Sequence, residues 1–105
     1  MKKQSNRLLL RGTLLLASFL LLAGCVSAGR GEKIYTREKC GNCHRFRGEG
    51  HSLAPDLTAV TGSRSEEWIR RQVVAPEKNN PRHRMPAYPH LSGQEIRSLI
   101  AYLKS

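Results

Sequence analysis

The stretch KCGNCHRF, residues 39–46, sets two cysteines three positions apart and places a histidine directly after the second. Two thiols and an imidazole at this spacing suit three kinds of chemistry. They can form half of a zinc site, a redox-active dithiol, or the point where a haem is attached covalently. The rest of the chain discriminates among the three.

Zinc and dithiol chemistry both lack supporting features elsewhere in the chain. A closed structural zinc site needs four ligands, of which CxxC supplies two. His44 is awkwardly placed beside Cys43, and no second CxxC or HxxxH follows. The remaining histidines would fit only an unusual arrangement: His51, His83 and His90. A thioredoxin-like dithiol lies beside a βαβ pattern, which this sequence does not show.

The CxxCH pattern is the attachment motif of c-type haem. Cys40 and Cys43 would form thioether bonds to the two vinyl groups, which places His44 under the iron as its proximal ligand. Beyond residue 24 the sequence has one methionine, Met85, in the stretch RMPAYP. Proline stiffens the backbone there, so Met85 is the predicted sixth ligand, and His83 and His90 are the competing candidates.

Residues 1–24 differ from the rest of the chain. MKKQSNRLLLR contains four basic residues and no acidic one, and TLLLASFLLLAG adds an apolar run of about a dozen residues. This pattern predicts a cleaved secretory signal, since a spanning helix needs about 20 apolar residues. The protein is therefore expected to be exported.

The charge of the remaining chain points to acidic partners. Residues 25–105 keep 14 basic and 8 acidic residues, a net charge of +6. Such a surface favours redox partner proteins with an acidic docking face, or an anionic membrane. Nucleic acid is not an expected partner, because the arginines are scattered rather than aligned on one helix and because export removes the chain from it.

Two segments have the hydrophobic spacing of amphipathic helices. They are residues 64–75, RSEEWIRRQVVA, and residues 93–105, GQEIRSLIAYLKS. A serine stands directly before each segment, and a glutamate lies three residues after that serine. This pair is the capping box that begins many helices. The two pairs are Ser63 with Glu66 and Ser92 with Glu95. A third, shorter helix is expected over residues 32–39.

Loops connect these helices. Residues 45–63 are rich in Gly, Pro, Ser and Thr, and residues 76–90 contain four prolines, which exclude regular helix or an inner strand. No strand pattern is present. A domain this small is marginally stable without a cofactor, metal or disulfides. The sequence thus predicts an all-α domain of three or so helices, with long loops wrapped around one covalent haem.

The end of the apolar run, LLAGC at residues 21–25, resembles the lipobox of bacterial lipoproteins. The resemblance implies cleavage before Cys25 and acylation of that cysteine; the alternative is an uncleaved signal anchor. Residues 25–31 would then be a lipidated N-terminus and tether, and residues 32–105 the domain. The anchor would lie on the periplasmic side, with the outer membrane favoured where one exists, because Val26 rather than aspartate follows the cysteine.

From about Gly31 to Leu103 the chain resembles a class I cytochrome c of the small, single-haem bacterial type. The matching stretches are GEKIYTREKCGNCH, LAPDLT, MPAY and IRSLIAYL. The resemblance implies that the carbonyl of Pro55 accepts a hydrogen bond from His44, and that Tyr102 packs against Gly31. It also implies a place for Trp68 near a haem propionate or against the haem edge. Arg64 is either a propionate partner or a solvated surface residue.

Together, the two resemblances imply a lipid-anchored carrier of single electrons between redox partners outside the cytoplasm. With both axial positions filled, the iron would have no free site for a substrate, so an enzyme is not expected. Two alternatives remain open. The chain can be a haem subunit docked on a larger oxidoreductase, or a gas-binding or peroxidase-like protein if Met85 is displaceable.

Overall fold

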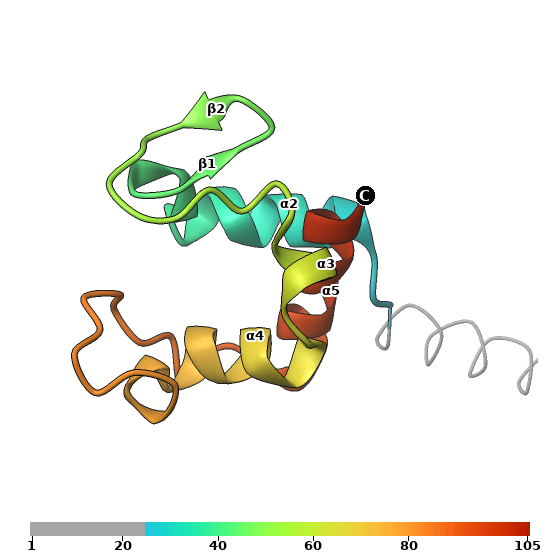
Figure 1. The fold of residues 1–105 in the computed structure, drawn as a ribbon. Coiled ribbons are helices and arrows are strands. Elements are labelled where there is room, and N and C mark those ends of the chain that lie inside the picture. Colours follow the sequence, from blue (N-terminus) through green and yellow to red (C-terminus); the bar gives the residue numbers. More distant parts are fainter. Residues whose placement is uncertain (1–24) are drawn as a thin grey trace, which may run out of the picture.

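The computed structural model describes residues 25–105, so the predicted signal segment 1–24 lies outside it. The described chain has four α-helices, two short 3₁₀ helices and one small hairpin, which agrees with the predicted all-α domain (Figure 1). Their bounds are α2 Ala28–Arg37, η1 Cys40–Asn42, β1 Arg45–Phe46, β2 Glu49–Gly50, α3 Val60–Ser63, α4 Glu66–Val74, η2 Pro76–Lys78 and α5 Gly93–Lys104. None of the helices in residues 25–105 is long and apolar enough to cross a membrane.

Helix α2 begins four residues earlier than expected. Ser27 is its N-cap, and the Ser27 hydroxyl accepts a hydrogen bond from the backbone N–H of Arg30 at 3.1 Å. The backbone N–H of Ser27 also donates to the Ser98 hydroxyl on α5 at 3.2 Å. Because this long-range contact fixes the start of the helix, residues 28–31 are helical rather than part of the predicted tether.

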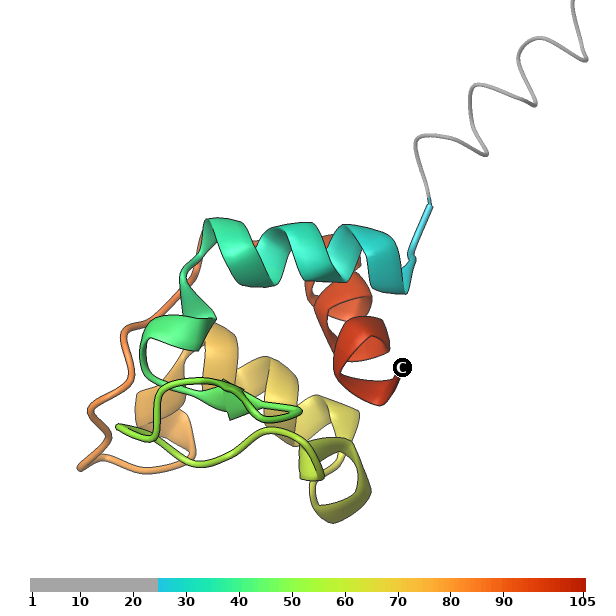
Figure 2. The same cartoon turned by 90° about the horizontal axis from the view of Figure 1, so that it is seen from above.

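Helices α2 and α5 cross at Gly31, and this crossing is the main tertiary contact of the fold (Figures 1 and 2). A Cβ atom on Gly31 would overlap the carbonyl oxygen of Ser98 and would lie 2.7 Å from the Cβ of Tyr102. Only glycine lets the two backbones approach this closely. The predicted packing of Tyr102 against Gly31 is confirmed.

Of the two predicted capping boxes, one forms and the other does not. Ser92 and Glu95 form the predicted box at the start of α5, with both hydrogen bonds at 3.1 Å. The Ser63–Glu66 box is wrong, because Ser63 ends α3 and its hydroxyl donates to the Val60 carbonyl. The chain is extended at Ser65, whose hydroxyl caps α4 by accepting from the Trp68 backbone N–H at 3.1 Å.

A short hairpin of two strands, β1 and β2, each two residues long, interrupts the segment that was expected to be all loop. Its turn is Arg47–Gly48, with φ of 51° and 81°. Positive φ at both central positions is the turn geometry that suits the twist of a hairpin. The hairpin is held by Phe46, which is buried and whose ring centroid lies 5.1 Å from that of Tyr102. Strands of two residues are too short to leave an alternating pattern in the sequence.

The hydrophobic core lies between α2, α4 and α5. Its buried members are Ile34, Ile69, Val73, Leu91, Ile96, Leu99 and Ile100. Partly buried side chains from the long loop after α4 pack against it, among them Met85 and Tyr88. The backbone N–H of Tyr88 donates to the Val73 carbonyl at 2.8 Å, so this loop has a fixed place on the core although it has little regular structure.

Candidate functional site

The CxxCH stretch forms a tight turn at the end of α2. Lys39 has a left-handed backbone, φ 59°, which ends the helix and redirects the chain. The Cys40 carbonyl then accepts from the backbone N–H groups of Cys43 at 3.2 Å and His44 at 3.0 Å. In a 3₁₀ turn, residues three apart lie on the same side. The two thiols therefore share one side of the turn, and neither forms a disulfide.

The environment of Cys40 does not suit a redox dithiol. Burial raises the pKa of the Cys40 thiol to about 11, whereas reactive dithiols need a lowered pKa to supply thiolate. The structure does not support a zinc site either. Within residues 25–105, no three side chains of His, Cys, Asp or Glu gather closely enough to hold a metal ion.

The imidazole of His44 is fixed by the loop that follows the hairpin. Its Nδ1 donates to the carbonyl oxygen of Pro55 at 2.7 Å, which confirms the predicted hydrogen bond. The loop is held in place because the Ala54 backbone N–H donates to the Cys43 carbonyl at 2.9 Å, and that of Leu57 to the Arg45 carbonyl at 2.8 Å. With Nδ1 engaged as a donor, Nε2 is the nitrogen left to bind a metal.

Gly50 brings the hairpin against the backbone of the histidine. Its φ is 104°, and a Cβ atom there would overlap the His44 carbonyl oxygen and lie 3.1 Å from that of Gly41. Both the backbone conformation and the close approach require glycine. Gly50 is thus a supporting position of the site that the sequence alone did not reveal.

Met85 lies in the long loop after α4, partly buried against the core. Its Sδ accepts a hydrogen bond from Gln72 Nε2 at 3.6 Å. The loop and the CxxCH turn lie at the same end of the molecule in both views (Figures 1 and 2). The loop that carries Met85 therefore lies at the same end of the molecule as the CxxCH turn.

Each of the other three histidines, the two competing candidates and His51, has a ring nitrogen within hydrogen-bond distance of an oxygen of the protein. His83 Nδ1 lies 2.8 Å from the Met85 carbonyl oxygen, and His51 Nδ1 lies 3.1 Å from that of Gly41. His90 Nε2 lies 3.0 Å from a carboxylate oxygen of Glu38, near the end of α2. That contact, more than the one from Arg37, holds the pKa of Glu38 below its ordinary value.

Trp68 projects from the first turn of α4 and packs partly buried against the core. The guanidinium of Arg64 stacks over its ring, 4.4 Å from the centroid. Arg64 is exposed, but its guanidinium covers one face of the indole instead of standing alone in solvent. Cys25, the predicted lipidation site, is exposed at the start of the described chain.

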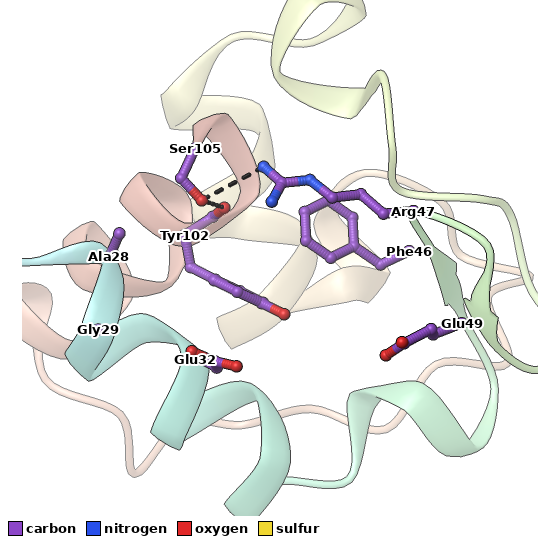
Figure 3. A pocket seen from close by; sticks show the side chains of 8 residues that line it. All are labelled: Ala28, Gly29, Glu32, Phe46, Arg47, Glu49, Tyr102 and Ser105. Atoms are coloured by element: carbon purple, nitrogen blue, oxygen red, sulfur yellow. Dashed lines mark hydrogen bonds between the residues drawn. The ribbon is translucent and has the colours of Figure 1, made fainter.

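A cavity of about 360 Å³ lies on another part of the surface, between α2, the hairpin and the end of α5 (Figure 3). Glu32 and Glu49 line it together with Arg47, whose guanidinium lies over the Phe46 ring and donates to the Ser105 hydroxyl at 3.3 Å. None of the predicted haem-site residues lines this cavity. Its charged walls also do not suit a large apolar cofactor.

Comparison with known proteins identifies the family. Residues 28–105 match the model of the cytochrome c family, so the chain belongs to that family. It is 35% identical over 86 residues to a nitric oxide reductase subunit of Halomonas halodenitrificans, covering 70% of this chain and 55% of that protein. It is 30% identical over 86 residues to the cytochrome c oxidase subunit 2 of Alkalihalophilus pseudofirmus, covering 74% of this chain and 25% of that protein.

The chain thus spans about half of one curated relative and a quarter of the other. Membership of the family implies covalently bound haem c, and Cys40 and Cys43 have the spacing of its attachment motif. The donor set fits that group, since the thiols are unpaired and the imidazole of His44 is oriented by Pro55. The chain is a c-type cytochrome.

Proposed function

We propose that this chain is a one-electron carrier in which His44 and Met85 are the axial iron ligands and Cys40 and Cys43 hold one haem c. The feature that best supports this is the hydrogen bond from His44 Nδ1 to Pro55. It fixes the orientation of the ring, leaves Nε2 for the iron, and makes the imidazole a stronger ligand. When bound, haem c supplies an iron that gains or loses a single electron.

The residues around the iron then favour electron transfer over catalysis. Thioether sulfur is a soft, neutral ligand that raises the reduction potential. Met85 and His44 together would fill both axial positions, so no site remains for a substrate, and we expect no enzymatic activity. Partial burial of Trp68 against the core is consistent with an indole that packs at the haem edge.

The partners we propose are redox proteins with acidic docking surfaces. The net charge of +6 over residues 25–105 favours fast, salt-sensitive encounters with such surfaces. The two relatives are subunits of an oxidase and of a nitric oxide reductase. They support the alternative that this chain is itself docked on a larger oxidoreductase and passes electrons to it.

The carrier function is tested by potentiometric titration of the purified haem protein. We expect a single reversible transition of one electron between two low-spin spectra. Haem should remain with the polypeptide through acid–acetone extraction, because thioether bonds to Cys40 and Cys43 hold it. Turnover of peroxide, or stoichiometric and rapid binding of carbon monoxide by the ferrous protein, would favour the peroxidase-like or gas-binding alternative.

We also propose that residues 1–24 are a cleaved export signal and that Cys25 is acylated on the periplasmic side of a membrane, with the outer membrane favoured where one exists. Each acyl chain contributes about 0.8 kcal/mol per buried CH₂, and stable anchoring takes two chains. Wild-type protein should therefore partition with membranes, and Cys25→Ala should either be soluble or keep its uncleaved signal. Mass spectrometry that finds Cys25 unmodified in the mature protein would disprove the anchor.

A further inference from the structure

We propose that one flank of helix α2, formed by Arg30, Lys33 and Arg37, lies on the headgroups of anionic phospholipids and sets the orientation of the anchored domain. This inference rests on the proposed acylation of Cys25. All three basic side chains are exposed, and they line one open groove on the outside of the helix. At about 100° per residue, the three positions point within about 60° of one another.

Two of these three charges are free to attract an anion. Within residues 25–105, no carboxylate lies within ion-pairing distance of Arg30 or Lys33. Arg30 uses one nitrogen to donate to the Cys25 carbonyl, a neutral group that leaves its charge uncompensated. Arg37 differs, because two carboxylates pair with it, at 3.1 and 2.9 Å. Arg30 and Lys33 therefore provide most of the attraction, and Arg37 contributes less.

The other sides of α2 do not suit an anionic surface. Gly31 and Ile34 are buried against the rest of the domain. Glu32 is the single acidic residue of the helix, and it lines the cavity beside the hairpin together with Glu49 (Figure 3). Glu32 also lines the groove, so negative charge begins at that side of the basic flank. Anionic headgroups would be repelled by the two glutamates and attracted along the flank.

The position of the anchor favours lipid over an acidic protein as the occupant of this flank. Cys25 is exposed, and its carbonyl oxygen lies 2.7 Å from Nη1 of Arg30. Acyl chains on Cys25 would therefore bring Arg30 to the headgroups. Lys33 follows about 5 Å further along the helix, which is within the distance of about 8 Å over which an anionic surface attracts charges at physiological salt.

Contact along this flank would hold the haem attachment turn close to the membrane. Helix α2 has ten residues, which is about 15 Å of helix, and it runs from the anchored end towards the turn that begins at Cys40. If the helix stood upright, the turn would lie about 15 Å further from the lipid. With the helix lying flat, the turn is beside the surface, within reach of redox partners in the same membrane.

The test measures how fast an amine-reactive reagent modifies Lys33 in the purified haem protein reconstituted in vesicles. Peptide mass spectrometry compares phosphatidylglycerol vesicles, which are anionic, with phosphatidylcholine vesicles, which are neutral. We expect Lys33 to react about 25-fold more slowly in phosphatidylglycerol, since each free charge contributes about fivefold at such a surface. High salt should abolish this protection, because it screens the surface charge. Lys78, exposed on η2, should react at the same rate in both vesicles.

The variant Arg30→Gln removes one free charge, and glutamine can still donate to the Cys25 carbonyl. It should reduce the protection of Lys33 by phosphatidylglycerol about fivefold. Arg71→Gln is the matched control, because Arg71 is exposed on α4, and it should leave the protection at the wild-type level. Equal reaction rates of Lys33 in the two kinds of vesicle, or protection of Lys78 instead, would overturn the inference while the anchor and the carrier function stand.

The anchor and the lipid contact can fail separately. Mass spectrometry that finds Cys25 unmodified would disprove the anchor alone. Salt-sensitive protection of Lys33 by phosphatidylglycerol would still support the contact in that case, and its absence would overturn it. Protection of Lys33 by soluble polyglutamate but not by phosphatidylglycerol would make the flank a docking surface for acidic proteins, which also overturns the inference.

Discussion

Replacing Met85 by alanine is expected to convert the carrier into a protein that binds carbon monoxide. The iron would lose its thioether ligand, so the ferric protein should lose the weak absorption band at the red edge of the visible spectrum that sulfur ligation gives. The reduction potential should fall by something on the order of 0.2 V, within the range of about 0.8 V that axial ligands cover. Ferrous protein should bind carbon monoxide stoichiometrically.

Met85→His separates the loss of sulfur from the loss of a ligand. Histidine can fill the sixth position, so this variant should exclude carbon monoxide and still have a lowered potential. If wild-type ferric protein lacks the band but its ferrous form excludes carbon monoxide, His83 or His90 is the ligand. The protein then still transfers electrons, but with a different driving force. If wild type binds carbon monoxide rapidly, the sixth position is open, and the carrier proposal fails.

Substituting Gly31 by alanine is expected to destabilise the whole domain. The added Cβ would overlap the Ser98 carbonyl oxygen, and backbone atoms of α5 can move only by separating the two helices. Overpacking of this kind costs about 3 kcal/mol. For a domain of this size such a loss lowers the midpoint of thermal unfolding by roughly 12–24 °C. Thermal unfolding of the haem-loaded protein, followed by circular dichroism, measures this effect.

Gly29→Ala makes the same chemical change two residues earlier on the same helix. A Cβ atom there meets nothing within 4 Å, and alanine favours helix by up to about 1 kcal/mol relative to glycine. Its unfolding midpoint should be unchanged or slightly raised. Equal midpoints for Gly31→Ala and Gly29→Ala would show that the α2–α5 crossing tolerates a wider separation than the contacts at Gly31 imply.

The features that sequence predicted correctly are those set by local chemistry or by a distinctive motif. Ser92 and Glu95 cap α5 as expected because both partners lie within one helical turn. The LAPDLT stretch placed Pro55 against His44 through its resemblance to a known loop. The start of α2 was misplaced because it depends on Ser98, 71 residues away from Ser27, and no local pattern indicates such a contact.

The site residues that sequence reasoning missed also depend on contacts between distant parts of the chain. Gln72 lies four residues after Trp68 on the inner side of α4. A polar amide among the apolar residues of that side was the one signal in the sequence that could have pointed to it. Nothing in the sequence shows that Asn79 turns back to bind both Trp68 and Gln72, since the prolines of the loop indicate only irregular structure. The hairpin was missed because Phe46 packs on Tyr102 from α5, a contact between residues that are far apart in the sequence.

The early start of α2 also bears on how an anchored form would meet its partners. The carbonyl of Cys25 accepts from Arg30 Nη1 at 2.7 Å, and Ser27 is bound to α5, so Val26 alone lies between two held residues. Three residues extend at most about 10 Å. A domain acylated at Cys25 would therefore remain in a thin layer above the lipid headgroups. Its search for a partner would be two-dimensional, and lateral diffusion in the lipid would govern how often an electron is passed on.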